Sequence, residues 1–108
     1  MMTHLLDGMQ ALQKQELSYA RKDHGERFNG MADGHLALCE EIQEAQEDWM
    51  CVQAAYNYLM TVYRREARVD TAVLARIESK AIHAACEMVQ VATVVRKMME
   101  SFDTEGKT

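Results

Sequence analysis

The chain has 108 residues, a net charge of −5, five glycines and no proline. The length predicts a single domain over residues 1–108, and the negative charge argues against a nucleic-acid backbone as the main partner. Residues that favour helices, above all Ala, Leu, Met, Glu and Gln, are plentiful, so the composition predicts an all-α fold.

The three cysteines, Cys39, Cys51 and Cys86, form no CxxC pair and lie within apolar helical patterns. We interpret them as small core residues of a cytoplasmic protein, in preference to a redox or zinc site. The first ten residues lack a signal-peptide pattern, and no apolar run approaches the roughly 20 residues that span a bilayer. We therefore expect no membrane partner.

An interrupted apolar stripe predicts a first helix from a cap at Thr3 to about Lys22. Three of the five glycines follow within residues 23–34, which predicts a loop there. Loops often carry binding groups, and this one offers His24, Asn29 and His35 as candidates. The alternative is that the loop is only a solvated connection.

Two regular apolar seams follow, with steps of three and four residues that are typical of packed helices. The first begins near Asp33 and comprises Leu38, Ile42, Ala45, Trp49, Val52, Tyr56, Leu59 and Tyr63. The second, behind a predicted N-cap at Asp70, comprises Leu74, Ile77, Ala81, Ala84, Met88, Val91, Val95 and Met98. A short polar link joins them, which predicts an antiparallel helical hairpin. The polar tail from Asp103 is expected to fray.

Acidic residues recur beside both seams at a helical spacing. Glu41 and Glu44 leave one side of the first long helix, and Glu87 and Gln90 repeat the three-residue step on the second. In an antiparallel hairpin, facing residues have position numbers with a constant sum. Glu44 with Glu87 and Glu41 with Gln90 share the sum 131, which places the turn next to Arg65. The two elements are therefore predicted to face each other.

Three carboxylates and one carboxamide in one place are hard oxygen ligands, which suit Mg²⁺ or Mn²⁺ better than zinc. The alternative is a solvated acidic face paired with Lys80 or Arg76. A di-iron carboxylate bundle is a more distant alternative, because it normally uses Glu-x-x-His pairs, which this sequence lacks.

The acidic elements resemble those of the all-α nucleotide pyrophosphohydrolases of the MazG and dimeric dUTPase type, which carry E-E-x-x-E on one helix and E-x-x-D on the next. Residues 40–44 (EEIQE) fit the first element in full, and residues 87–90 (EMVQ) fit the second with one change. The loop at residues 24–29 (HGERFN) is similar to that of small MazG-like proteins of phages and prophages. The resemblance covers roughly residues 23–99.

The resemblance implies a helical bundle that assembles as an oligomer and hydrolyses a nucleoside triphosphate to the monophosphate and pyrophosphate. It implies that Glu41, Glu44 and Glu87 hold Mg²⁺ as catalytic residues, with Gln90 at the fourth position. The loop residues His24 and Asn29 would then approach the base or ribose. By helical spacing, Lys80 and His83 are further candidates for contacts with phosphate oxygens.

Two departures from the family pattern are visible. Gln90 replaces an aspartate and brings no charge, and the 42 residues from Ala45 to Cys86 between the acidic elements are more than is usual in the catalytic relatives. The alternative function is a non-catalytic helical module of phage or prophage origin, whose acidic crevice is vestigial or binds a ligand without turnover.

The apolar stripe of the last helix broadens beyond Ala81, where further apolar residues join the seam: Ile82, Ala85, Val89, Ala92, Val94 and Met99. Two long helices and one shorter helix cannot cover so broad a stripe. Large exposed apolar patches usually mark interfaces, so the sequence predicts a homodimer or a higher homo-oligomer.

Overall fold

The computed structural model describes residues 2–66, 68 and 70–106 of the chain. These residues form three α-helices and no strand: α1 (Met2–His24), α2 (Met31–Arg64) and α3 (Thr71–Gly106). The predicted all-α class is confirmed, as is the predicted order of one shorter helix followed by two long ones.

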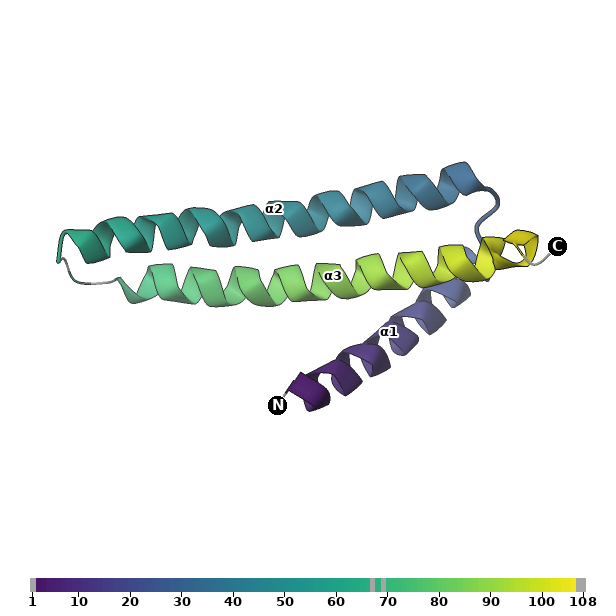
Figure 1. The fold of residues 1–108 in the computed structure, drawn as a ribbon, viewed down its shortest axis with the longest axis horizontal. Coiled ribbons are helices and arrows are strands. Elements are labelled where there is room, and N and C mark those ends of the chain that lie inside the picture. The colour runs from purple at the N-terminus through teal and green to yellow at the C-terminus, as the bar shows by residue number, and fades with distance from the viewer. Residues whose placement is uncertain (1, 67, 69, 107–108) are drawn as a thin grey trace.

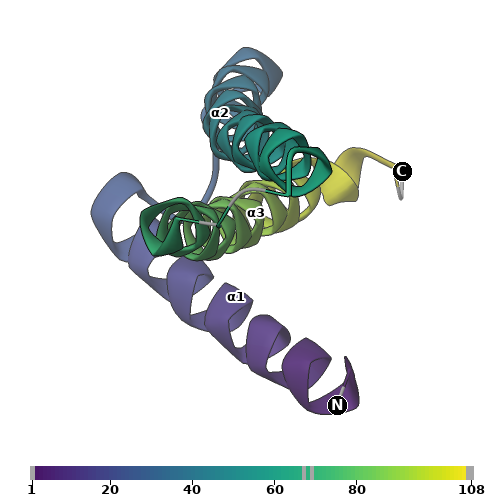
Figure 2. The ribbon, with the colours of Figure 1, turned by 90° about the vertical axis from the view of Figure 1, so that its left-hand side faces the viewer.

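The helices α2 and α3 run antiparallel along nearly their whole length (Figure 1). Viewed along the hairpin, α3 lies between α2 and α1 (Figure 2). The α1–α3 contact is partly polar, because the Gln13 side chain donates a hydrogen bond to the carbonyl of Ala92 (3.1 Å) and Arg21 forms an ion pair with Glu100. The hairpin is therefore the frame of the fold, and α1 packs against one of its two helices.

The helix boundaries follow the local capping signals in part. Asp70 caps α3 as predicted, since its carboxylate accepts a hydrogen bond from the backbone N–H of Ala72 (2.9 Å). Thr3 lies inside the first turn of α1 and is not its cap. The loop before α2 is shorter than predicted, because α2 already begins at Met31. The backbone of α3 continues past Asp103 to Gly106.

Each predicted seam is divided between two environments. Every second member points toward the partner helix of the hairpin and is buried or half-buried. These members are Leu38, Ala45, Val52 and Leu59 on α2, and Ile77, Ala84, Val91 and Met98 on α3. Taken in antiparallel order, as Leu38 with Met98 and so on, each facing pair has position numbers that sum to 136. The predicted sum was 131, so the observed register differs from the predicted one.

The remaining seam members are exposed and form what we call the apolar strip. It comprises Ile42, Trp49, Tyr56 and Tyr63 on α2, and Leu74, Ala81, Met88 and Val95 on α3. The larger side chains among them are between 37% and 74% exposed. Taken in antiparallel order, as Ile42 with Val95 and so on, each pair has position numbers with the same sum. The strip therefore runs along a single face of the hairpin. Helical spacing places Glu41, Glu44 and Glu87 on the opposite flank of the α2–α3 contact.

The single chain has little interior of its own. It measures 63 × 30 × 25 Å, and its radius of gyration is 18.2 Å, compared with about 13 Å for a compact domain of this size. Among the described side chains, only two apolar ones, Leu17 and Ala45, are buried. Cys39 and Cys86 are exposed, so the prediction that they are core residues is wrong for these two. Cys51 is half-buried.

No helix in the described part of the chain is both long enough and apolar enough to cross a membrane.

Candidate metal centre

Three carboxylates from the two long helices converge on one side of the hairpin. Glu41 and Glu44 of α2 and Glu87 of α3 each place a carboxylate oxygen within 4.8 Å of the other two. We call these three residues the acidic cluster. The two acidic elements come together, although the predicted register is about five residues off. The buried seam pairs have position numbers that sum to 136 instead of 131, so Glu44 and Glu87 meet diagonally across the contact and not level with each other.

The cluster raises the pKa values of two of its members. Burial is the main cause that raises the pKa of Glu87 from 4.5 to about 7. A hydrogen bond with Glu44 and repulsion from Glu44, Glu41 and Asp48 act in the same direction. Burial and repulsion from Glu44 also raise the pKa of Glu41, and hydrogen bonding with Glu87 partly opposes this. The cluster is therefore short of positive charge.

One oxygen of the cluster has no partner. Glu41 Oε2 is buried and accepts no hydrogen bond from any described residue, although a buried polar atom is normally satisfied. A divalent cation between the three carboxylates would supply that partner and would neutralise their repulsion. Because all the donors are hard carboxylate oxygens, the residues present fit Mg²⁺ or Mn²⁺.

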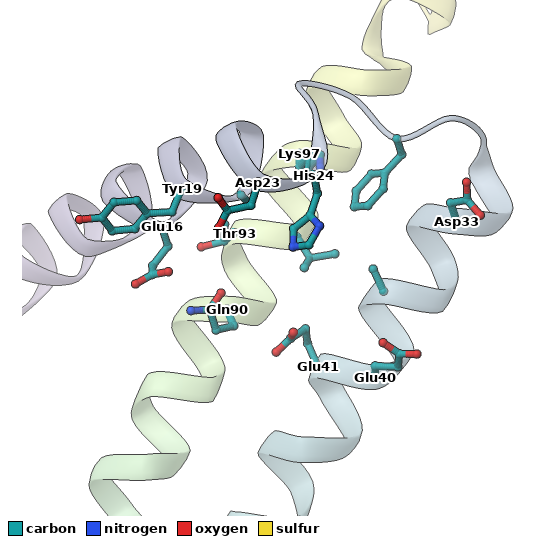
Figure 3. A pocket seen from close by; sticks show the side chains of 14 residues that line it. Glu16, Tyr19, Asp23, His24, Asp33, Glu40, Glu41, Gln90, Thr93 and Lys97 are labelled. Carbon is teal, nitrogen blue, oxygen red and sulfur yellow. The ribbon is translucent and has the colours of Figure 1, made fainter.

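A cavity of about 510 Å³ adjoins the cluster between α1 and the hairpin (Figure 3). Glu41 belongs to both the cluster and the cavity lining. Gln90 also lines the cavity, where Figure 3 shows it on α3 across from Glu41. The fourth position of the second acidic element therefore lies beside the cluster, but with a neutral amide in place of a carboxylate.

The four predicted substrate-binding residues differ in their position relative to the cavity. His24 lines the cavity and points into it from the end of α1 (Figure 3). Asn29 is exposed and does not line the cavity. Lys80 lies 3.6 Å from Asp48, so its ammonium group already has a carboxylate partner. His83 is exposed on α3. The structure thus brings one of these four, His24, to the cavity beside the cluster.

Sequence reasoning missed several residues around the site. Asp48 acts on Glu87 and pairs with Lys80, and its spacing of four residues from Glu44 was a usable signal. Thr93 and Lys97 line the cavity and are only 2% and 4% exposed. The sequence did contain a usable sign of both residues, because each is a polar residue within the broad apolar stripe of α3. Phe28 packs its ring against Lys97, with 4.6 Å from the ammonium nitrogen to the ring centroid.

Comparison with known proteins adds no identification. No protein-family model, curated protein or solved structure matches the chain significantly.

Proposed function

We propose that the chain is a nucleoside triphosphate pyrophosphohydrolase that uses Mg²⁺ or Mn²⁺. Water would attack the triphosphate, and the products would be a nucleoside monophosphate and pyrophosphate. The observation that carries the proposal is the acidic cluster: three carboxylates from two helices lie within 4.8 Å of one another, and one of their oxygens is buried without a partner. The resemblance of residues 40–44 and 87–90 to the acidic elements of the MazG type supports it.

In this proposal Glu41, Glu44 and Glu87 hold the metal. A divalent cation bound there would neutralise phosphate charge and lower the pKa of the attacking water. Gln90 would contribute a neutral carbonyl oxygen, which weakens the site relative to one with a fourth carboxylate. Lys80 is already paired with Asp48, so we assign it a smaller part than the cluster.

A direct assay tests the proposal. Purified protein is mixed with a panel of ribo- and deoxyribonucleoside triphosphates and with Mg²⁺ or Mn²⁺, and the release of pyrophosphate is measured. We expect release that depends on the metal and that is lost in Glu44→Gln, which keeps the shape of the side chain. Glu47→Gln removes the same charge from an exposed position of α2 outside the cluster, so it should retain activity.

Two results would contradict the proposal. Absence of pyrophosphate release from every nucleotide, together with no rise in melting temperature on adding metal, would favour the non-catalytic helical module. Gln90 in place of an acidic residue is the feature that favours this second candidate. Loss of the circular dichroism signal in Glu44→Gln would show instead that Glu44 is structural.

The apolar strip supports a further part of the proposal, a symmetric homodimer. Its eight residues continue the heptad spacing of the hairpin contact, which is the pattern of helices covered on a second side. The strip is contributed equally by α2 and α3, so a second copy turned by a two-fold axis would present a matching surface. Two such hairpins would form a four-helix core, which the single chain lacks. The acidic cluster would remain open on the other flank.

We further propose that the protein works in the cytoplasm, where nucleoside triphosphates and Mg²⁺ are both present. The three cysteines form no disulfide, in keeping with a reducing compartment.

A further inference from the structure

We infer that Asp48 of α2 is a further carboxylate of the metal centre, and that it acts on the bound cation through a water molecule that the cation holds. This inference rests on the proposed metal-dependent function, and it adds a residue that lies outside both acidic elements. It is carried by the register of the hairpin and by the position of the ion pair between Asp48 and Lys80.

The register of the hairpin places Asp48 across from Glu87. Facing residues of the buried seams have position numbers that sum to 136, and 48 and 87 sum to 135. Glu44 with Glu87 gives 131, so Glu44 reaches Glu87 diagonally, whereas Asp48 lies almost level with it. Because Asp48 follows Glu44 by four residues, both side chains leave the same side of α2. Asp48 therefore borders the acidic cluster on the side toward the turn of the hairpin.

The carboxylate of Asp48 is partly buried and close enough to act on the cluster. Its side chain is 17% exposed, and its Oδ1 atom lies 3.6 Å from the ammonium nitrogen of Lys80. Burial is the main cause of the raised pKa of Glu87, and repulsion from Asp48 adds to it. A divalent cation at the cluster would relieve that repulsion as well as the repulsion within the cluster.

The distances favour an indirect contact between Asp48 and the cation. Asp48 is not one of the three residues whose carboxylate oxygens all lie within 4.8 Å of one another. A cation held by the acidic cluster is therefore better placed to meet Asp48 through a water than directly. Mg²⁺ usually keeps several of its waters in a protein site, and carboxylates outside the first set of ligands tune metal affinity. Asp48 would thus supply negative charge that Gln90 does not bring.

Lys80 is the cation that competes for Asp48 in the metal-free chain. Its ammonium group pairs with Asp48 and brings a positive charge next to the acidic cluster. That charge repels a divalent cation and engages the carboxylate that would hold the metal-bound water. Removal of Asp48 should therefore weaken metal binding, and removal of Lys80 should strengthen it. An ion pair with a purely structural role would not give opposite effects of this kind.

Titration calorimetry with Mn²⁺ alone tests the inference. Asp48→Asn keeps the size of the side chain and removes its charge, and we expect it to weaken Mn²⁺ binding about tenfold, as is typical of such outer carboxylates. Lys80→Gln should bind Mn²⁺ severalfold more tightly than the unmodified chain. Glu47→Gln and Arg76→Gln remove one charge of each sign from exposed positions of the same two helices. Since salt screens exposed charges, they should change the affinity by less than about twofold.

Solvent-proton relaxation gives a second measurement, the number of water molecules on the bound Mn²⁺. Because Asp48 acts through a water, Asp48→Asn should leave this number unchanged. Loss of a direct ligand would instead let a further water bind. An increase in Asp48→Asn would therefore overturn the indirect contact that we infer.

The outcomes separate this inference from the proposed reaction. Unchanged Mn²⁺ affinity in Asp48→Asn, or weaker binding in Lys80→Gln, would overturn the inference even if the unmodified chain releases pyrophosphate. Weaker binding in Asp48→Asn without turnover of any triphosphate would support the role of Asp48 and contradict the proposed hydrolysis. If circular dichroism shows that Asp48→Asn does not fold, the affinity of Lys80→Gln decides. Absence of Mn²⁺ binding to the unmodified chain would also overturn the inference.

Discussion

Glu41 of α2 and Glu87 of α3 bring carboxylate oxygens within 4.8 Å of each other across the hairpin, and an oxygen of Glu44 lies within the same distance of both. The proximity of three like charges is unfavourable without a proton or a cation. Burial is the larger cause of the raised pKa values of Glu41 and Glu87, and repulsion between the carboxylates adds to it. The cluster is thus a place where the stability of the fold, the pH and metal binding are linked.

The metal-free protein should lose stability as the pH rises from 4.5 to about 7. The pKa of Glu87 is raised to about 7 in the folded state, so the folded chain binds a proton more tightly than the unfolded chain. Its stabilising contribution is complete below pH 4.5 and is lost as the pH passes 7. Melting temperatures recorded between pH 4 and 8 in the presence of a chelator measure the effect.

The variant Glu87→Gln isolates this contribution, because the amide cannot titrate. Relative to the unmodified chain, its melting temperature should depend less on pH over that interval and should be higher at pH 8. Added Mg²⁺ should stabilise the unmodified chain more at pH 8 than at pH 5, since the cation competes with the proton. Identical pH dependence in both proteins would contradict the assignment of the raised pKa to Glu87.

Gln90→Asp should strengthen metal binding. The change places a fourth carboxylate in the cavity lining beside Glu41, and affinity for hard cations rises with the number of charged oxygen ligands. We expect Mg²⁺ to bind about tenfold more tightly, which titration calorimetry measures, and the metal-free protein to melt at a lower temperature. Gln46→Asp, which adds the same charge at an exposed position of α2, should leave the Mg²⁺ affinity unchanged.

Trp49→Glu should dissociate the proposed homodimer. Trp49 is 55% exposed in the single chain and lies near the middle of the apolar strip, where a carboxylate would be buried without a partner between two copies. We expect light scattering at micromolar concentration to give a dimer for the unmodified chain and a monomer or unfolded chain for the variant. Met50→Glu, at a neighbouring exposed position outside the strip, should remain dimeric. A monodisperse monomer for the unmodified chain would remove the dimer from the proposal.

Two glycine-to-alanine changes should have opposite effects on the stability of the fold. Gly25 follows α1 with φ +89° and has open space around its Cα, so alanine there meets only backbone strain, worth about 1 kcal/mol or somewhat more. Gly8 lies inside α1 with open space as well, and alanine there should stabilise the helix by up to about 1 kcal/mol. Thermal unfolding should show a decrease of several degrees for Gly25→Ala and an increase for Gly8→Ala. A decrease for both would show that α1 is sensitive at Gly8 for another reason.

The sequence was sufficient for those parts of the structure that depend on periodicity and local caps. The seams predicted two long antiparallel helices, the spacing of the acidic residues predicted that Glu41, Glu44 and Glu87 lie near one another, and Asp70 was identified as the cap of α3. The exact register was not predicted, because the turn lies a few residues beyond Arg65. Each of these follows from helical geometry alone, because a seam of three- and four-residue steps leaves few ways to pack two helices.

The remaining features depend on tertiary packing that local patterns do not encode. The spacing of the seams could not predict that Trp49 and Met88 are exposed in the single chain. Contacts within a chain and contacts between chains both use steps of three and four residues. The cavity was also not predicted, since it depends on where α1 crosses α3. That crossing is set by side chains distant in sequence, such as Arg21 with Glu100 and Phe28 with Ser101, whose hydroxyl accepts the backbone N–H of Phe28 (3.0 Å).

The two flanks of the hairpin have different chemistry although they come from the same two helices. Glu41 and Ile42 are sequence neighbours, yet one belongs to the acidic cluster and the other to the apolar strip. Substitutions at interleaved positions can therefore alter one flank and leave the other intact. Substitutions in such a chain can change what the acidic flank binds without changing how the chain assembles. They can equally change the assembly without changing the acidic flank, because the two flanks share a backbone but no side chains.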